Sequence, residues 1–243
     1  MKFSEGATIV TGGGAGIGAG VTQRLLGEGA RVVSIARRAP DFTHDRLSFV
    51  QADLADRKET ADAAREIVIK EKILRIVHNA GVIRPALVED AKLEDLDYLT
   101  NLHLGAMLTL VQAALPAMKE EKFGRIVGVS SRGALGLQTR TNYAATKAGM
   151  FGMLRSWALE LGPIGITANC VAPGPIESDM FHEIVPEGSE RKKQLADAIP
   201  VKRIGVADDV ANAVSFFLSP DSGFVTGQTL YVCGGTSIGS VVI

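Results

Sequence analysis

The chain has 243 residues, of which 46% are hydrophobic and 22% are charged, and its 26 basic residues nearly balance 27 acidic ones. A net charge of −1 gives no general attraction to nucleic acid or to an anionic membrane, and no apolar run approaches the 18 residues of a membrane span. The length suits one α/β domain, so we expect a single domain over residues 1–243, located in the cytoplasm because no secretory signal precedes the first apolar run.

Short apolar runs alternate along the chain with longer amphipathic ones. We expect seven strands, at Ala7–Val10, Ala30–Ala36, Leu47–Ala52, Leu74–Val77, Arg125–Ser130, Ile166–Val171 and Thr229–Val232. Helical spacing of apolar residues predicts helices at Ile17–Glu28, Lys58–Lys70, Leu93–Glu120, Asn142–Leu161 and Asp208–Leu218. This repetition is typical of an α/β, doubly wound, Rossmann-type fold, with a mostly parallel sheet covered by helices on both faces. Ligands of such sheets bind at the carboxyl ends of the strands.

A glycine-rich turn, Thr11-Gly12-Gly13-Gly14-Ala15-Gly16-Ile17-Gly18, lies between the first expected strand and the first expected helix. Glycine lets the backbone turn tightly and lets a pyrophosphate approach the helix amides, where the macrodipole favours negative charge. The spacing is G-x-x-x-G-x-G rather than the common G-x-G-x-x-G. A glycine cluster alone also fits an ordinary loop, but its position between strand and helix favours a dinucleotide site.

The end of the second expected strand indicates which dinucleotide binds. NAD sites usually place Asp or Glu there to hold the ribose hydroxyls. Here the strand ends in Ala36-Arg37-Arg38, with no acid, and two guanidinium groups offer charge-assisted hydrogen bonds to a 2′-phosphate. We therefore favour NADP(H) as the cofactor. NAD(H) is the alternative, in which Arg37 and Arg38 are ordinary surface residues.

One segment, residues 177–203, interrupts the alternation of strands and helices. It carries two prolines, Pro186 and Pro200, and a basic run at Arg191-Lys192-Lys193. Because it follows the sixth expected strand, it belongs to the ligand-binding end of the sheet. We interpret it as an insertion that forms a substrate lid, although a plain surface excursion fits the same pattern.

Taken together, the motifs resemble the short-chain dehydrogenase/reductase superfamily, in its short single-domain branch, over essentially the whole chain. The matching residues are the glycine turn, Asp53 after strand three, Asn79-Ala80-Gly81 after strand four, Ser130-Ser131 ending strand five, Tyr143-Ala144-Ala145-Thr146-Lys147 on the next helix and Pro173-Gly174 after strand six. The resemblance implies an NAD(P)-dependent oxidoreductase that interconverts a carbonyl and an alcohol by hydride transfer. It also implies a homo-oligomer, a tetramer or a dimer.

The resemblance also implies a role for individual residues. Tyr143 is then the catalytic acid/base, Lys147 its electrostatic partner and Ser131 the hydroxyl that orients the carbonyl. Asp53 would contact the adenine, Asn79 the cofactor ribose side, and Ile176 with Ser178 the nicotinamide carboxamide. The full set that we expect to contact the cofactor is Gly12, Gly14, Gly16, Ile17, Gly18, Arg37, Arg38, Asp53, Leu54, Asn79, Ala80, Gly81, Tyr143, Lys147, Pro173, Gly174, Ile176 and Ser178.

The chemistry of Tyr143 and Lys147 can also be argued from their spacing. Residues four apart on a helix share one face. Reduction of a carbonyl needs a proton for the developing alkoxide, and a phenol with a pKa near 10 releases its proton reluctantly at neutral pH. A neighbouring ammonium favours the phenolate, and the Ser131 hydroxyl can donate a hydrogen bond to the same substrate oxygen. A Tyr–Lys pair at this spacing is by itself common surface decoration, and only the surrounding motifs favour catalysis.

The chain departs from the resembled pattern at one catalytic position. Family members usually carry an Asn early in the long helix before strand five, and counting back from Leu115-Pro116 places His103 there. That Asn supports a helix irregularity whose main-chain carbonyl holds a water in the proton relay. We expect that His103 takes this place, either by keeping the backbone relay or by supplying its imidazole. The alternative is that a gap shifts the alignment and Asn101 is the functional residue.

The sequence leaves the substrate open. We expect a small carbonyl or alcohol as substrate. One alternative is a 3-oxoacyl-acyl-carrier-protein-reductase-like enzyme, with a basic docking patch made of Arg132, Arg140 and Arg191–Lys193. The other is a non-catalytic nucleotide-sensing protein. No metal site is expected, because the histidines and the two cysteines have no metal-ligand spacing. We read Cys170 as a small core residue and His78 as a half-buried histidine at a strand end.

Overall fold

The structure is a computed structural model that describes residues 3, 5–178, 181–182 and 185–238. Its centre is a seven-stranded parallel sheet in the order β3-β2-β1-β4-β5-β6-β7. The strands are β1 (Ala7–Thr11), β2 (Arg31–Ala36), β3 (Leu47–Gln51), β4 (Ile73–His78), β5 (Gly124–Val129), β6 (Ile166–Pro173) and β7 (Thr229–Val232). All seven expected strands are therefore present, and the predicted Rossmann-type fold is confirmed.

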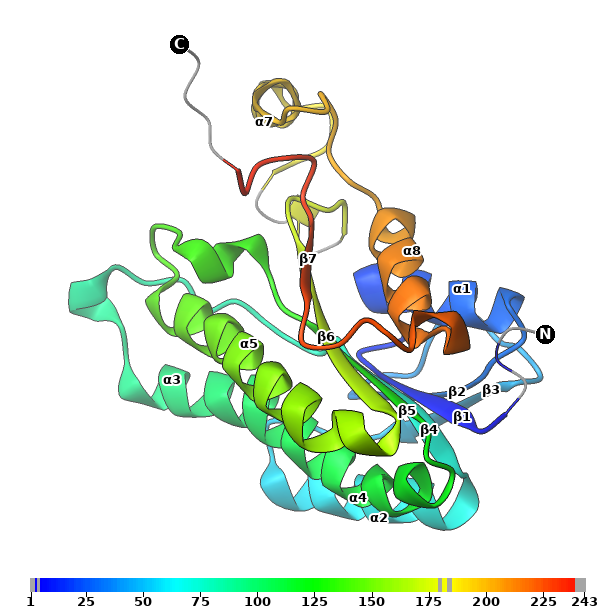
Figure 1. Ribbon diagram of the computed structural model, residues 1–243. Coiled ribbons are helices and arrows are strands. Elements are labelled where there is room, and N and C mark those ends of the chain that lie inside the picture. The colour runs from blue at the N-terminus through cyan, green and yellow to red at the C-terminus, as the bar shows by residue number, and fades with distance from the viewer. Residues whose placement is uncertain (1–2, 4, 179–180, 183–184, 239–243) are drawn as a thin grey trace.

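Helices cover both faces of the sheet (Figure 1). On one face lie α1 (Gly16–Gly27) and α8 (Ala207–Leu218), which share an apolar core with the strands. On the other lie α2 (Arg57–Lys70), α4 (Ala106–Glu120) and α5 (Thr141–Leu161). Two further α-helices lie within the described residues: α3 (Leu93–Thr100), which leads into α4, and α7 (Glu190–Ala198). The central strands β1, β4, β5 and β6 are buried along their whole length, as expected for strands covered on both faces.

The long helix expected over Leu93–Glu120 is divided in the structure. A π-helical turn, Asn101–Gly105, separates α3 from α4. A π-turn adds one residue to a helical turn, so the apolar spacing on either side continues and the sequence pattern does not register the break. This turn carries His103, and its Leu102 carbonyl lies 3.0 Å from Nε2 of His78 at the carboxyl end of β4.

Segment 177–203 contains one regular helix, α7, within the described residues. Ser189 begins it by accepting a hydrogen bond from the backbone N–H of Lys192. The segment is tied back to the fold at its two ends, because Ile176 pairs with Gly205 and the N–H of Val201 donates to the Gly234 carbonyl. In Figure 1 α7 lies beyond the carboxyl ends of β6 and β7.

Two arginines are buried side by side in the centre of the sheet, at the end away from the glycine turn. Arg75 on β4 is paired in register with Arg125 on β5, and each is 3% exposed. Both guanidinium groups lie over the Phe123 ring and donate to backbone carbonyls at the carboxyl end of α8, those of Leu218 and Ser219. They thus satisfy the last carbonyls of α8 and place positive charge at the negative end of its dipole.

Candidate functional site

The glycine turn joins the carboxyl end of β1 to the start of α1. Gly12 has φ +65°, a conformation that favours glycine. A side-chain carbon on Gly18 would lie 1.9 Å from the Gly12 carbonyl oxygen and 2.6 Å from Asn79 Nδ2, so glycine is required there by close approach. Position 18 therefore packs the start of α1 directly against the turn.

Hydrogen bonds join this turn to the end of β4. The Thr11 hydroxyl oxygen accepts from the backbone N–H groups of Asn79 and Ala80, each at 2.9 Å. The Asn79 side-chain amide donates to the carbonyl oxygen of Thr11 at 3.2 Å. The ends of β1 and β4 are thus held together, and Asn79 and Ala80 lie beside the glycine turn as the sequence predicts.

The start of α1 fits a phosphate group. Its N-cap residue, Ala15, has no side chain that accepts from the first helical amides, which leaves these amides for an anionic ligand. Ser178, from the segment after β6, lies next to Gly16, with its Cβ 3.3 Å from where a side-chain carbon on Gly16 would be. The two predicted cofactor segments therefore meet at this helix terminus.

The predicted nucleotide-specificity residues lie at the carboxyl ends of β2 and β3. Arg37 and Arg38 are exposed directly after β2, and Gln51 at the end of β3 donates to the Arg37 carbonyl at 3.2 Å. Asp53 follows β3, and one of its carboxylate oxygens accepts from the N–H of Ala55 at 2.9 Å. Leu54 is buried. These residues border the glycine turn on the side toward the sheet edge.

Ser131 and Tyr143 both lie beside Gly133, and their side chains interact. A side-chain carbon on Gly133 would lie 3.2 Å from Ser131 Oγ and 3.4 Å from Tyr143 Cε1. Ser131 Oγ accepts from the N–H of Gly133 at 2.9 Å, so its own hydrogen is available for another acceptor. The structure therefore brings together the two hydroxyl groups that the sequence assigned to the substrate oxygen.

Lys147 is buried on the same face of α5, one turn after Tyr143. Its Nζ donates to the carbonyl oxygen of Val129 at 2.8 Å and lies 5.8 Å from the centre of the Tyr143 ring. The backbone of the same residue is fixed, because Ser130 Oγ donates to the Lys147 carbonyl at 2.8 Å. The ammonium is thus anchored to the end of β5 beside Tyr143.

Burial dominates the protonation behaviour of both groups. Burial lowers the pKa of Lys147 to about 8, and it raises the pKa of Tyr143 above its usual value. Hydrogen bonding from Ser131 and the charge of Arg140 oppose the rise at Tyr143 without reversing it. The lowering expected from the sequence depends on the ammonium together with a bound oxidised nicotinamide; in the chain alone, the loss of solvent at Tyr143 outweighs the hydrogen bond from Ser131 and the charge of Arg140.

His103 lies in the π-helical turn and is completely buried. Its ring packs edge-to-face on Tyr143, with 5.7 Å between ring centres, and its Nδ1 lies 2.8 Å from Thr146 Oγ1. Asn101, the alternative, lies at the start of the turn and accepts from Arg57 Nε on α2 at 2.9 Å. The structure thus places His103, and not Asn101, against Tyr143.

The other predicted cofactor residues line the rest of this end of the sheet. A side-chain carbon on Gly81 would lie 3.0 Å from His103 Nε2, and one on Gly174 would lie 2.8 Å from the Cα of Cys233. Pro173 ends β6, and Ile176 is buried. Both glycines therefore stand where a larger residue would meet its neighbours.

The burial of one residue at the site, His78, was underestimated from the sequence, and another, Thr146, was not identified there. His78 is fully buried rather than half-buried, and both ring nitrogens have partners, Thr11 Oγ1 at 3.2 Å and the Leu102 carbonyl at 3.0 Å. Thr146 lies inside the Tyr-x-x-x-Lys motif, where its contact with His103 has no signal in the spacing. Only three-dimensional proximity reveals either link.

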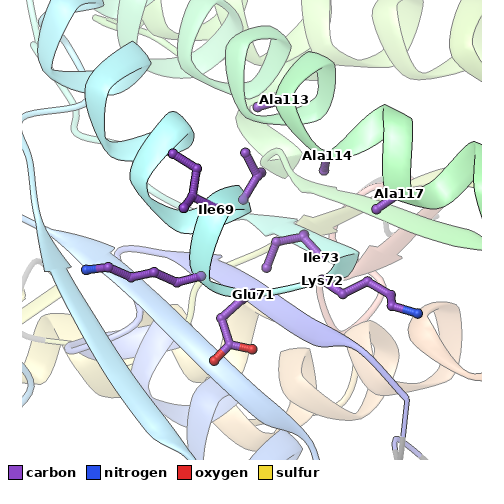
Figure 2. A pocket seen from close by; sticks show the side chains of 9 residues that line it. Ile69, Glu71, Lys72, Ile73, Ala113, Ala114 and Ala117 are labelled. Carbon is purple, nitrogen blue, oxygen red and sulfur yellow. The ribbon is translucent and has the colours of Figure 1, made fainter.

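A separate hollow of about 270 Å³ lies at the opposite end of the sheet, between the end of α2, the start of β4 and α4 (Figure 2). Figure 2 shows Ile69, Ile73 and three alanines of α4 around it, with Glu71 and Lys72 at its edge. It is distinct from the carboxyl-end site.

Among the described residues, no group of three or more His, Cys, Asp or Glu side chains gathers as a metal site. No helix in the described part of the chain is long and apolar enough to cross a membrane.

The parallel sheet and the glycine turn define a dinucleotide-binding protein of the Rossmann type, and the comparisons with known proteins agree. A family model described as enoyl-(acyl carrier protein) reductase matches residues 12–237. The dehydrogenase subunit BbsD from Thauera aromatica, which acts on (2S)-[(R)-hydroxy(phenyl)methyl]succinyl-CoA, is 36% identical, with 98% of this chain and 99% of that protein covered. The 3-oxoacyl-[acyl-carrier-protein] reductase FabG of Staphylococcus aureus is 35% identical, with 97% and 99% covered.

Among solved structures, a blue fluorescent protein from a metagenomic library, in complex with NADPH, superposes with a TM-score of 0.85. It is 30% identical, and 97% of this chain and 99% of that chain are covered. The chain belongs to the short-chain dehydrogenase/reductase superfamily and is an oxidoreductase that uses a nicotinamide cofactor.

Proposed function

We propose that this protein reduces a carbonyl or oxidises the corresponding alcohol with NADP(H), and that Tyr143, Lys147 and Ser131 carry the proton chemistry. The observation that carries the proposal is their arrangement at the carboxyl end of the sheet. The Ser131 and Tyr143 side chains lie side by side about Gly133, and the buried Lys147 ammonium lies behind the Tyr143 ring. This cluster faces the same end of the sheet as the glycine turn.

A bound nicotinamide supplies or accepts the hydride, and the chain's residues handle the substrate oxygen. In the reducing direction, the Ser131 hydroxyl and the Tyr143 phenol donate hydrogen bonds to the carbonyl oxygen, and Tyr143 gives its proton to the alkoxide as it forms. Lys147 stabilises the tyrosinate that remains. In the oxidising direction, the same tyrosinate takes the hydroxyl proton. Because burial raises the pKa of Tyr143, the phenol is the resting form and the reducing direction starts without a prior proton loss.

The residues expected at the cofactor fit that role in position. The amides at the start of α1 would hold the pyrophosphate, and Gly12, Gly14, Gly16, Ile17 and Gly18 give it close backbone approach. Asp53 and Leu54 would border the adenine, and Asn79, Ala80 and Gly81 the ribose beside it. Pro173, Gly174, Ile176 and Ser178 would border the nicotinamide, with Tyr143 and Lys147 on the ribose that carries it.

The preference for NADP(H) rests on Arg37 and Arg38. Both are exposed directly after β2, and the position before them is Ala36 rather than an acid that would repel a phosphate. The relative bound to NADPH supports this choice. Two guanidinium groups at the ribose end of the site suit a 2′-phosphate.

We further propose that residues 1–243 act as one domain, with segment 177–203 as a lid over the substrate. Ser178 packs next to Gly16, so the start of the segment lies against the cofactor turn. The Lys192–Glu177 ion pair, with 2.7 Å between Nζ and Oε1, joins α7 to the beginning of the segment. This pair lies within the segment and would move with it, whereas opening the lid would separate Ser178 from Gly16.

The substrate class has a second candidate, a 3-oxoacyl thioester, because the two curated relatives act on a CoA thioester and on an acyl-carrier-protein thioester. The basic patch expected for an acidic carrier protein is already engaged in part. Arg132 Nε donates to the Thr236 carbonyl at 3.1 Å, Arg140 donates to Thr139, and Lys192 pairs with Glu177. The relatives support a thioester carried either by CoA or by an acyl carrier protein. We also propose that the protein works in the cytoplasm as a homo-oligomer, where the unpaired thiols of Cys170 and Cys233 stay reduced.

The Tyr143→Phe variant tests the proposal. With NADPH and acetoacetyl-CoA or a panel of small ketones, we expect turnover to fall by at least about 100-fold, because the phenol proton is lost while the ring stays. NADPH affinity should stay within about threefold of the parent. The matched control is Tyr231→Phe on β7, whose ring packs edge-to-face on Phe151. Turnover near the parent level in Tyr143→Phe would overturn the acid/base assignment, and NADPH binding without turnover of any substrate in the parent would favour a nucleotide sensor.

A further inference from the structure

Two buried histidines lie on either side of Leu102, and their hydrogen bonds fix where each carries its proton. At His78, Thr11 Oγ1 already accepts from two backbone N–H groups, so the Thr11 hydroxyl hydrogen is directed to His78 Nδ1. His78 therefore carries its proton on Nε2 and donates to the Leu102 carbonyl at 3.0 Å. Both nitrogens are satisfied, and His78 holds the π-helical turn against the end of β1.

The same argument gives the opposite tautomer for His103. Thr146 Oγ1 lies 3.1 Å from the carbonyl oxygens of Asn142 and Tyr143, which can only accept, so the Thr146 hydrogen points to them. Its oxygen is then the acceptor for the His103 Nδ1–H at 2.8 Å. His103 Nε2 is left with a lone pair and no proton.

His103 Nε2 and Lys147 Nζ both lie close to Gly81. His103 Nε2 is a buried nitrogen without a hydrogen-bond partner among the described residues. Both distances are measured from the position that a side-chain carbon on Gly81 would take. His103 Nε2 lies 3.0 Å from that position, and Lys147 Nζ lies 3.3 Å from it. Lys147 uses one of its three protons on the Val129 carbonyl. An acceptor without a hydrogen-bond donor among the described residues and an ammonium with two further protons therefore lie near the same point beside Gly81, and they are not hydrogen-bonded to each other in this structure.

We propose that Thr146 fixes His103 as the Nδ1–H tautomer, and that the Nε2 lone pair is the acceptor that holds the Lys147 ammonium beside Tyr143. His103 and Thr146 are then positioning residues: the imidazole stays neutral and stabilises the charged form of Lys147. This inference rests on the proposed roles of Tyr143 and Lys147. Two roles were expected for His103, a backbone-carbonyl relay and a role of the imidazole, and this inference favours the imidazole.

The titratable groups packed around this pair set the direction of the effect. They are Tyr143, which lies on α5 with Lys147, His78 on β4 and Cys170 on β6. Burial keeps Cys170 protonated by raising the pKa of its thiol to about 12. Both histidines are neutral at pH 7, because burial and the charge of Lys147 lower their pKa values. The ammonium thus has neutral neighbours, and a lone-pair acceptor raises its pKa against the effect of burial. Removing that acceptor lowers the pKa of Lys147, so the ammonium is lost at a lower pH.

The tautomer can be measured without any variant. In the full-length protein labelled with 15N-histidine, two-bond 1H–15N correlations distinguish Nδ1–H from Nε2–H rings. We expect His78 to report Nε2–H and His103 to report Nδ1–H, with and without NADPH; the signals are assigned by their loss in His78→Gln and His103→Gln. Thr146→Ser should keep the His103 pattern, and Thr146→Val should shift it toward Nε2–H. An Nε2–H pattern for His103 in the parent would overturn the inference, whatever the enzyme's activity.

The functional half of the inference is tested by the pH dependence of kcat. His103→Phe keeps the edge-to-face contact with Tyr143 but removes the acceptor, and Thr146→Val removes the group that sets the tautomer. In both we expect the alkaline limb of kcat to move to lower pH by at least half a unit, while Thr146→Ser follows the parent. Thr167→Val on β6 is the matched control, because it changes a buried hydroxyl that has no hydrogen-bond partner within the described part of the chain. Alkaline limbs that coincide in all variants would refute the pairing with Lys147. Activity retained in Tyr143→Phe would instead refute the proposed function and leave the tautomer result standing.

Discussion

Replacing Gly18 by alanine is the sharpest test of the glycine turn. The added carbon would lie 1.9 Å from the Gly12 carbonyl oxygen, 2.7 Å from the Gly12 carbonyl carbon and 2.6 Å from Asn79 Nδ2, whereas ordinary van der Waals contact begins at 3.4 Å. Two of these atoms belong to the backbone of the turn and cannot rotate away. The start of α1 must therefore move outward, and the amides that would hold a pyrophosphate move with it.

Forced overpacking of this kind costs about 1–3 kcal/mol. If that cost falls on the bound conformation of the turn, the affinity for NADPH drops by about 5- to 150-fold. The same strain in the folded state lowers Tm by about 3–10 °C for a chain of this size. Calorimetric titration of NADPH and thermal unfolding measure the two effects on one sample.

Gly27→Ala is the matched control, because Gly27 ends the same helix and a side-chain carbon there meets nothing within 4 Å. We expect unchanged NADPH affinity and a small gain in stability, up to about 1 kcal/mol, since alanine favours the helix. If Gly18→Ala binds NADPH as tightly as the parent and unfolds at the same temperature, the turn does not hold the cofactor by close approach of Gly18. Equal losses in both variants would show a general effect on α1.

Three further predictions concern the cofactor, the buried arginines and pH. At one salt concentration, the double variant Arg37→Ser/Arg38→Ser should lose at least about tenfold of its affinity for NADPH relative to NADH, about 1.4 kcal/mol, and an unchanged ratio in paired titrations would contradict the 2′-phosphate assignment. Arg125→Met should lower the free energy of unfolding, measured in urea, by about 2–4 kcal/mol, because the carbonyls of Ser219, Pro220 and Gly165 lose their donor. The control Arg65→Met, at an exposed position, should change it by no more than about 0.5 kcal/mol. Equal effects of the two variants would argue against stabilisation of these carbonyls by Arg125. Burial lowers the pKa of His78 to about 3, against 6.5 in the unfolded chain. Between these two pH values the unfolded state therefore binds more protons than the folded state. The stability that His78 contributes is lost as the pH falls through that window. The loss at pH 5 is about 2 kcal/mol, and His78→Gln should flatten this part of the stability–pH curve.

The fold was predictable because its signals are local and repeated. Buried parallel strands need continuous apolar runs, and each run in the sequence became a strand. The π-helical turn was not predictable from apolar spacing, because a one-residue insertion in a long helix leaves both flanking patterns intact. Arg75 and Arg125 fall within expected strands, and the sequence pattern gives no sign that they are buried. Their burial depends on carbonyls more than 90 residues away in the chain, at the end of α8.

The candidate site was predictable where chemistry follows from short motifs. The glycine turn, Asn79 and the Tyr143–Lys147 pair lie at one end of the sheet, as parallel strands dictate. Two features depend on side chains that meet only in the folded chain: the contact of Thr146 with His103, and the link from Thr11 through His78 to Leu102. The rise in the pKa of Tyr143 in the chain alone was also not predictable, because spacing reveals nearby charges but not how much water burial removes.

The packing of α8 on α1 has a consequence for the order in which the protein matures on the ribosome. Gly20 of α1 meets Ala207, and Arg24 hydrogen-bonds Asn212, so the outer side of the first helix is covered by one of the last to be translated. Val21 and Leu25 belong to an apolar cluster that includes α8, so this cluster is incomplete until α8 has been made. The first strand–turn–helix unit to be made is thus among the last to be fully covered, and the apolar core on this face of the sheet is incomplete for most of synthesis.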